Sequence, residues 1–292
     1  MTSSNHTQNG SGERRDTDIA RALDAGEIQA YFLPKVDLRS ARVVGVEALA
    51  RWVHPTTGVI SAQAFIDLVT HGGHERALTE KVIEYSTRAA GDWWRSGLGL
   101  QLSLNLPLGA VTPDWNLPEL VSDALAASGL PGEALEFEVT EDGLLVNPEM
   151  AADLLGELNQ LGATISIDDF GTGYFSLRQL KRLPIDELKL DRSLVSGLND
   201  EENRSIVRSA IHLAHQMSIQ VVAEGVETET AWRQLRSMGC ERAQGHLIAE
   251  PLPAREVPAW LASWNQRARE LSSSRRMRRT ATAQQRREAT AA

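Results

Sequence analysis

Five short apolar runs in this sequence each end on an acidic or amide residue. The runs are brief, rich in β-branched residues and bounded by turn residues, so they predict buried strands. If those strands are neighbours in a sheet that closes into a barrel, the polar residues at their ends converge on one point. The runs end at Glu47, Asn105, Glu138, Asp168-Asp169 and Glu224.

A cluster of this composition predicts a cation site. Carboxylates held close together repel one another unless a positive charge lies among them. Oxygen ligands of this kind suit Mg²⁺ or Mn²⁺. The sequence therefore indicates a divalent-metal centre at one end of a barrel.

The order of the elements predicts the fold. Strand-like and helix-like segments alternate over about 250 residues, the usual size of a (β/α)₈ barrel. We expect an α/β fold, a modified TIM barrel. The link at residues 38–41 is too short for a helix, so the first two strands should form a hairpin with one antiparallel strand near the N-terminus. The expected strands are 30–37, 42–50, 100–106, 135–140, 164–169, 187–190, 221–224 and 242–244, and the expected helices 61–71, 78–96, 117–127, 148–161, 175–183, 200–217 and 228–238.

A doubly wound open sheet is the alternative fold. That fold would need a glycine-rich phosphate loop after an early strand. Neither a G-x-G-x-x-G motif nor a P-loop occurs in the sequence, which favours the barrel.

Composition divides the 292-residue chain into three parts. We expect a disordered polar segment at 1–15, one folded domain at 16–265 and a basic disordered tail at 266–292. The net charge of −9 argues against nonspecific nucleic-acid binding by the body of the protein. The single cysteine, Cys240, and the lack of an apolar segment long enough to span a bilayer fit a cytoplasmic protein.

Several motifs follow one another along the chain. They are Glu47-Ala48-Leu49 with Arg51-Trp52, Asp168-Asp169-Phe170-Gly171-Thr172-Gly173-Tyr174, Lys189-Leu190-Asp191, Ala223-Glu224-Gly225-Val226-Glu227-Thr228 and Gln244-Gly245. Together these motifs resemble the EAL domain family. The resemblance covers about Asp16 to Val257 and implies a modified TIM barrel that hydrolyses cyclic di-GMP to linear pGpG with Mg²⁺ or Mn²⁺, two ions being expected. Two metals suit this reaction because a phosphodiester is an anion with a poor leaving group.

The resemblance implies roles for individual residues at the metal centre. Lys189 resembles the lysine that contacts the attacking water, and Glu224 a ligand or general base; which group takes the proton stays open. Glu47, Asn105, Glu138 and Asp168 resemble the ligands of the first metal, and Asp168, Asp169 and Glu224 those of the second.

Other positions resemble residues that contact the substrate or support the metal ligands. Arg51 resembles a phosphate contact, a role that suits a bidentate guanidinium. Glu141 resembles the glutamate that braces the loop Asp169–Ser176, in which Gly171 and Gly173 give backbone freedom. Gln244 resembles a further residue near the metals, and Glu227 a nearby outer acceptor.

The sequence departs from the family pattern in the substrate region. The pair Leu33-Pro34 stands where the family usually has Gln-Pro, so one polar substrate contact is missing. The next residue, Lys35, is expected either to supply another contact or to face solvent. His246 and Glu250 replace an aromatic and a basic residue of the family.

These observations leave three functions open. The first is a stand-alone EAL phosphodiesterase, expected to form a homodimer and to be regulated through dimerisation or a protein partner. The second is a receptor that holds cyclic di-GMP with weak or no turnover, which Leu33 favours. The third is a protein-interaction regulator, which the complete ligand set disfavours. Contact of the basic tail with nucleic acid or lipid is a minor expectation.

Overall fold

The molecule is built around a closed β-sheet. The computed structural model describes residues 18–171 and 180–269. Within these ranges the sheet has ten strands, and pairing of the first two strands closes it into a ring of eight, with β3 (Gly58–Ser61) and β10 (Leu252–Pro253) beside the ring. The ring contains β1 (Ile28–Asp37), β2 (Val43–His54), β4 (Gln101–Asn105), β5 (Leu135–Thr140), β6 (Thr164–Phe170), β7 (Glu187–Leu190), β8 (Gln220–Ala223) and β9 (Arg242–Ala243).

The predicted hairpin is confirmed. β1 pairs antiparallel with β2 on one side and with β9 on the other, whereas the pairs from β2–β4 round to β8–β9 are parallel. Leu33 lies opposite Glu47 in the β1–β2 register. The fold is therefore a modified TIM barrel with one antiparallel strand, as expected, and the carboxyl ends of its parallel strands share one rim.

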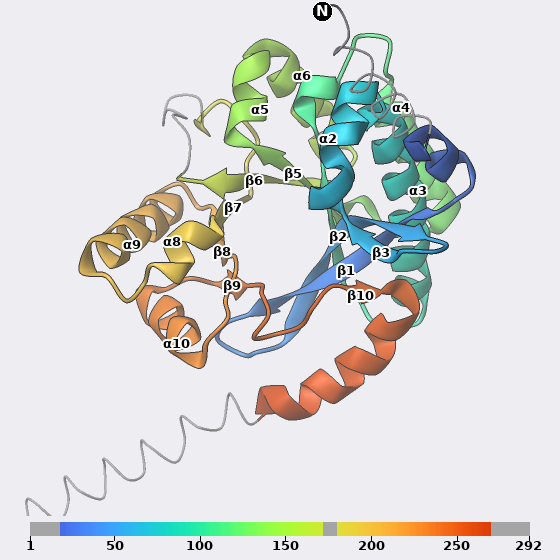
Figure 1. Cartoon of the computed structure of the whole chain (residues 1–292). Helices are drawn as coiled ribbons and strands as arrows, with labels where there is room; N and C mark the ends of the chain where they lie inside the picture. Colours follow the sequence, from blue (N-terminus) through green and yellow to red (C-terminus); the bar gives the residue numbers. More distant parts are fainter. Residues whose placement is uncertain (1–17, 172–179, 270–292) are drawn as a thin grey trace, which may run out of the picture.

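Helices form an outer ring around the barrel (Figure 1). Six of the expected helices are present within a few residues, while the expected 175–183 helix lies mostly outside the described residues. The sequence analysis missed the short helices α5 (Glu141–Val146) and α8 (Arg192–Ser196) and the helical segments 18–24 and 257–269. The remaining helices are α2 (Ala62–Gly72), α3 (Glu75–Arg95), α4 (Leu117–Ser128), α6 (Pro148–Gln160), α9 (Glu201–Gln216) and α10 (Glu229–Met238).

Capping residues explain small differences at helix starts. The side chains of Asp200 and Thr228 accept hydrogen bonds from the backbone amides of Asn203 and Ala231. Such N-caps satisfy amides in the first turn but lie outside the helix themselves. α9 and α10 therefore each begin one residue later than predicted.

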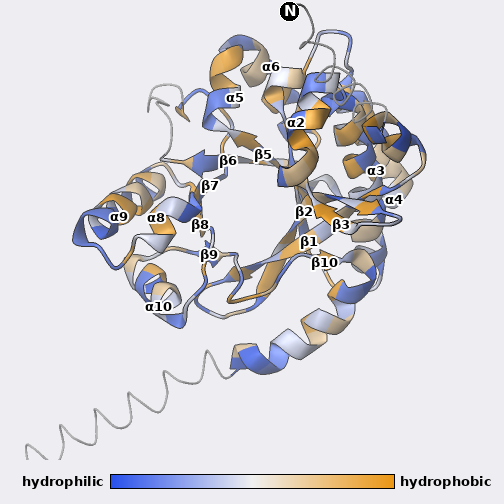
Figure 2. Cartoon of the chain, viewed as in Figure 1, coloured by the Kyte–Doolittle hydropathy of each residue, from blue (hydrophilic) through white to orange (hydrophobic). Residues whose placement is uncertain are grey.

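Hydrophobic residues pack between the strands and the helix ring rather than inside the barrel. On β5, Leu135, Phe137 and Val139 belong to the main core, whereas Glu136 and Glu138 form buried ion pairs with lysines of other strands. The ring helices carry both hydrophobic and hydrophilic segments (Figure 2), as expected for helices with one buried face. Polar and charged side chains therefore occupy the barrel interior.

The C-terminal helical segment, 257–269, packs on the barrel and extends past the expected domain end at 265. Trp264 is buried, and its indole Nε1 donates to the backbone oxygen of Ala41 at 2.8 Å. Among the described residues, no helix has the length and apolar character needed to span a membrane.

Candidate metal centre

Four carboxylates, three of them on β2, β5 and β6 and the fourth directly after β8, converge on the ammonium group of Lys189. Nζ of Lys189 lies 2.7 Å from Glu138 Oε2, 2.8 Å from Glu224 Oε1 and 3.2 Å from Asp168 Oδ1. Glu47 Oε2 is 3.5 Å away. The convergence that the run ends predicted is therefore present.

Lys189 is fully buried and remains charged. Burial by itself would lower the pKa of the ammonium, but the surrounding carboxylates outweigh that effect and hold the pKa of Lys189 well above its usual value. A buried cation in this position neutralises part of the repulsion among the acids.

Two amide side chains orient Glu47. Asn105 Nδ2 donates to Glu47 Oε1 at 3.1 Å, and Gln244 Nε2 donates to Glu47 Oε2 at 2.6 Å. Burial raises the pKa of Glu47, but Lys189 and these two donors outweigh it, so the pKa of Glu47 is lowered. Gln244 also donates to Glu224 Oε1 at 2.8 Å, which links two of the acids.

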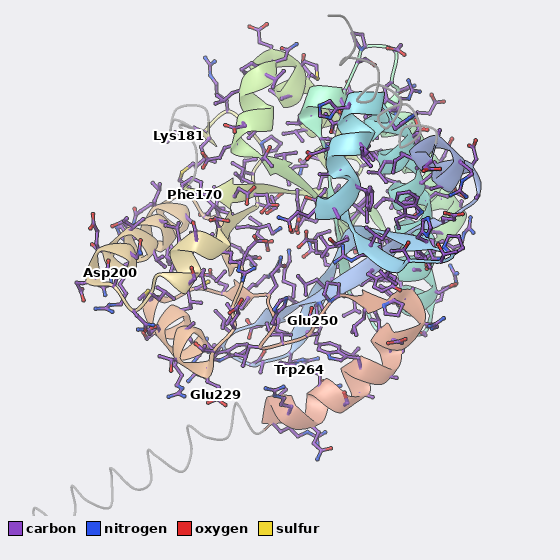
Figure 3. The ribbon with its side chains drawn as sticks, viewed as in Figure 1. Phe170, Lys181, Asp200, Glu229, Glu250 and Trp264 are labelled. Carbon is purple, nitrogen blue, oxygen red and sulfur yellow. The ribbon has the colours of Figure 1, made fainter. Side chains whose placement is uncertain are left out.

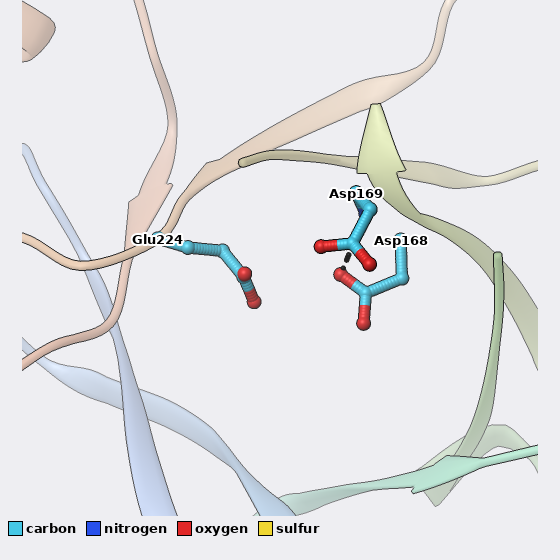
Figure 4. Close-up of side chains that lie close together, drawn as sticks. All are labelled: Asp168, Asp169 and Glu224. Carbon is cyan, nitrogen blue, oxygen red and sulfur yellow. Dashed lines mark hydrogen bonds between the residues drawn. The ribbon is translucent and has the colours of Figure 1, made fainter. Parts of the chain in front are cut away.

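Asp168 and Asp169 both lie in the cluster because the strand is irregular there. Neighbouring residues of a regular strand point to opposite faces. The β6–β7 register shifts between Ile167 and Phe170, and Asp169 has a positive φ of 56°. This left-handed conformation, which aspartate tolerates better than most residues, lets both carboxylates approach Glu224, as Figure 4 shows.

The charge of the cluster fits two divalent cations. Oxygen atoms of Asp168, Asp169 and Glu224 lie within 4.8 Å of one another, close enough to share an ion. The five carboxylates of Glu47, Glu138, Asp168, Asp169 and Glu224 carry −5 when ionised, and Lys189 carries +1, so the group totals −4. Two divalent ions would neutralise that charge, and hard oxygen ligands suit Mg²⁺ or Mn²⁺.

Two of the acids resist ionisation without a metal. Burial raises the pKa of Glu224 to about 7, with Asp168 and Glu47 adding to the rise against the opposing effect of Lys189. Burial and Glu47 likewise hold the pKa of Glu138 well above its usual value. The metal-free cluster therefore takes up protons near neutral pH.

Metal binding should consequently strengthen as the pH rises. Folding raises the pKa of Glu224 to about 7, so the protonated carboxyl stabilises the metal-free fold at low pH. This contribution to stability is fully present below the unfolded pKa and is lost as the pH rises through about 7. A metal ion must displace the same proton. We expect the dissociation constant for Mn²⁺, measured by calorimetry, to fall at least about tenfold between pH 6 and pH 8. A pH-independent constant would contradict this assignment.

The loop expected to follow β6 is described only at its start. The backbone amide of Gly171, at φ 101°, donates to Oε1 of the buried Glu141 at 3.1 Å. Glu141 therefore contacts the start of the loop Asp169–Ser176, which the resemblance implies that it braces. Gly173 and the rest of the segment up to Ser176 lie outside the described residues.

Not all predicted substrate residues face the cluster. Leu33 lies across from Glu47, but Pro34 is the next residue along β1, and alternation places it on the opposite face. Arg51 is half-buried and donates to the backbone oxygen of Ala50 at 2.8 Å. Burial lowers the pKa of Arg51, against the attraction of Glu47 and Glu250.

Glu250 brings a negative charge to the same region as Arg51. Its Oε2 lies 3.4 Å from Nε2 of His246, and both side chains are largely exposed. Figure 3 labels Glu250 beside the barrel centre. An acidic residue at this position makes the electrostatic field around Arg51 less favourable to an anion than a basic residue would.

Glu227 does not join the cluster. Its carboxylate pairs with Arg192 at 2.8 Å and is about half exposed. Gly225 lies between the two acids of this motif with φ 61°, and a Cβ there would lie 2.3 Å from Cγ of Arg192. Glycine is therefore required where the chain turns away from Glu224, and Glu227 points toward α8 instead.

The sequence analysis missed a second charged layer inside the barrel. Lys35 is fully buried, which corrects the expectation of a substrate contact or a solvent-facing side chain. It pairs with Glu136 and Glu187, and Arg242 pairs with Glu187. A sequence signal for this layer was present. Its members Glu136, Glu187 and Arg242 lie two positions before Glu138, Lys189 and Gln244, and residues two apart on a strand share one face.

The fold and the site define a class of protein: a TIM-like barrel with an acidic, lysine-centred cluster at the carboxyl ends of its strands. The EAL domain family model matches residues 16–251. The chain belongs to the EAL domain family.

Several relatives and solved structures are similar to this chain. An uncharacterised protein of Azorhizobium caulinodans is 43% identical, over 77% of this chain and 31% of its own length. The cyclic di-GMP phosphodiesterase NbdA of Pseudomonas aeruginosa is 35% identical, over 85% of this chain and 32% of its own length. The PaMucR phosphodiesterase, solved as a c-di-GMP complex, has a TM-score of 0.78 at 34% identity and covers 84% of this chain and 99% of that one.

A further solved structure comes from a mycobacterium. The EAL domain of Mycobacterium smegmatis DcpA has a TM-score of 0.69 at 33% identity and covers 81% of this chain and 98% of that one. The chain spans about a third of the length of the Azorhizobium caulinodans and Pseudomonas aeruginosa relatives named above, 31% and 32%.

Proposed function

We propose that this protein hydrolyses cyclic di-GMP to linear pGpG. The observation that carries the proposal is the contact of Lys189 with four carboxylates from β2, β5, β6 and the end of β8. A site that only bound the dinucleotide would not need this concentration of buried charge. Family membership and the similarity to NbdA and PaMucR support the choice of substrate.

The cluster would hold two divalent ions, Mg²⁺ or Mn²⁺. When bound, they would stabilise the negative charge of the phosphodiester and activate the water that attacks it. Glu47, Asn105, Glu138 and Asp168 would hold the first ion, and Asp168, Asp169 and Glu224 the second.

The chain's own residues would orient the reactants around those ions. Lys189 would hold the attacking water through its ammonium group, since it lies among the ligands and stays charged. Arg51 would contact a phosphate at the rim, where its guanidinium can bind two oxygens. Gln244 would keep Glu47 and Glu224 in place through its two donated hydrogen bonds.

Product analysis tests the proposal directly. Purified protein is incubated with cyclic di-GMP and Mn²⁺, and the products are separated by chromatography. We expect linear pGpG from the natural sequence and none from Glu224→Gln. The matched control is Glu229→Gln, because Glu229 lies on α10 in the outer ring and pairs with Arg233 (Figure 3). Binding of cyclic di-GMP without product would contradict the proposed enzyme.

A receptor that retains cyclic di-GMP is the second candidate. The observation in its favour is Leu33, which lies directly opposite Glu47 and offers no hydrogen bond there. The acidic Glu250 near Arg51 also weakens attraction for an anion. Substrate affinity is thus the property that Leu33 and Glu250 should affect most.

Restoring the amide at position 33 tests that idea. We expect Leu33→Gln to lower KM about tenfold or more, the effect of roughly one added hydrogen bond to a charged group, with kcat changed less. Steady-state kinetics measures both constants. Leu33→Met, which adds no donor, is the control. An unchanged KM in Leu33→Gln would place Leu33 away from the substrate.

A further inference from the structure

Beneath the metal centre, four charged side chains form a compact and electrically balanced layer. Lys35 Nζ lies 2.6 Å from Glu136 Oε1 and 2.5 Å from Glu187 Oε1. Arg242 Nη1 lies 2.6 Å from Glu187 Oε2. Two cations offset two carboxylates, so this floor layer (Lys35, Glu136, Glu187 and Arg242) does not need a metal for its own neutrality.

One member of the floor layer reaches the metal centre. Lys35 Nζ lies 4.0 Å from Glu138 Oε1, while Lys189 Nζ lies 2.7 Å from Oε2 of the same carboxylate. Oε1 is buried and has no hydrogen-bond partner among the residues that the structure describes. Glu138 is therefore held between two ammonium groups, one from each layer.

Such a carboxylate depends on its charged surroundings. A buried carboxylate oxygen without a partner is costly unless a cation lies close by. Lys35 can serve as that cation without leaving its place, because Glu136 and Glu187 hold its ammonium from the floor. Groups that orient metal ligands in this way contribute strongly to metal affinity.

We propose that Lys35 is a positioning residue that holds Glu138 as a metal ligand from below. The inference rests on the proposed function, because it takes Glu138 to be a ligand. It assigns Lys35 no contact with substrate. Lys35 acts through Glu138, and Glu136 and Glu187 each hold its ammonium in place.

Two charge-balanced double variants separate this role from general support of the fold. Lys35→Met with Glu136→Gln removes the ammonium beside Glu138, whereas Arg242→Met with Glu187→Gln removes the other ion pair and leaves Lys35 charged. Each keeps the floor layer neutral, so long-range attraction for a metal ion stays the same. If the first pair does not fold, Lys35→Gln with Glu136→Gln makes the same comparison with amide hydrogen bonds retained.

The primary measurement is Mn²⁺ binding by calorimetry, without substrate, beside thermal unfolding in EDTA. We expect the Lys35 pair to bind Mn²⁺ about tenfold or more weakly than the natural sequence. The Arg242 pair should stay within about threefold of it, below the loss expected for a lost ligand support, because Lys35 stays charged and Glu136 still holds its ammonium. Turnover by the Lys35 pair should recover as the Mn²⁺ concentration is raised.

The outcomes distinguish this inference from the proposed function. Equal loss of Mn²⁺ affinity in both pairs, or no loss in the Lys35 pair, would overturn the role of Lys35 and leave the enzyme standing. A natural sequence that binds Mn²⁺ but yields no pGpG would overturn the proposed function alone. A natural sequence that does not bind Mn²⁺ would overturn both.

Discussion

Asp168→Asn is expected to reduce hydrolysis of cyclic di-GMP by at least about 1,000-fold, since losing a ligand exceeds the 10–100-fold loss typical of its outer partners. Asp168 is the carboxylate that the proposed site assigns to both metal ions. Its Oδ1 is 3.2 Å from Lys189, and it lies in the same group of oxygens as Asp169 and Glu224. An amide of the same shape removes one negative charge and one of the two carboxylate oxygens.

The measurement is the initial rate of pGpG formation at saturating Mn²⁺. The matched control is Asp153→Asn on α6, an exposed aspartate outside the cluster, which should retain the full rate. Because the side-chain shape is preserved, the fold should be unaffected, and the unfolding midpoint in EDTA should not decrease. Full activity in Asp168→Asn would sink the assignment of the site.

Lys189→Met should have the largest effect on the stability of the metal-free protein. It leaves four carboxylates around an apolar side chain, and removing one partner of a buried ion pair typically costs about 3–5 kcal/mol. For a domain of this size that loss corresponds to a midpoint roughly 10 °C lower. Added Mn²⁺ should restore much of the difference, because bound cations offset the carboxylate charge.

Thermal unfolding in EDTA and in Mn²⁺ tests this prediction. The control is Lys181→Met, which replaces an exposed lysine and should leave both midpoints unchanged. We also expect Lys189→Met to lower kcat more than it weakens binding of cyclic di-GMP, given the proposed contact with the attacking water. Equal losses in both constants would argue against that contact, and an unchanged midpoint in EDTA would argue against Lys189 as the neutralising cation.

The sequence predicted the barrel because each strand run had its own local signal. Short β-branched runs alternating with helix-length segments indicated a (β/α)₈ barrel, and the four-residue link after Asp37 indicated the hairpin. β3 was not predicted because it has only four residues, lacks a distinct apolar run and ends at the residue before α2 begins. The 175–183 helix lies mostly outside the described residues and stays a prediction.

The cluster was predictable for the same reason, but its details were not. Strand ends share a rim in any parallel barrel, so Glu47, Glu138 and Glu224 could be grouped from sequence. That Asp168 and Asp169 approach the same acid depends on the left-handed turn at Asp169. That Glu227 turns toward Arg192 depends on the path of the chain after Gly225.

Lys35 shows most clearly what tertiary structure alone decided. In the sequence it is a lysine after a proline, and such a residue is normally exposed. In the barrel it faces inward, and Glu136 and Glu187 from other strands neutralise it. The two-residue spacing within each strand indicates that these charges share the inward face, but which of them pair is a property of the closed sheet.

The sequence by itself thus determined the element order, the barrel and the set of acids at its rim, because these follow from local periodicity and from where each run ends. Only the tertiary structure decided which charges meet. Lys189 lies at the centre of four carboxylates, and Lys35 lies beneath Glu138. The physical reason is that burial makes each ionised group depend on partners that closure of the barrel brings from other strands.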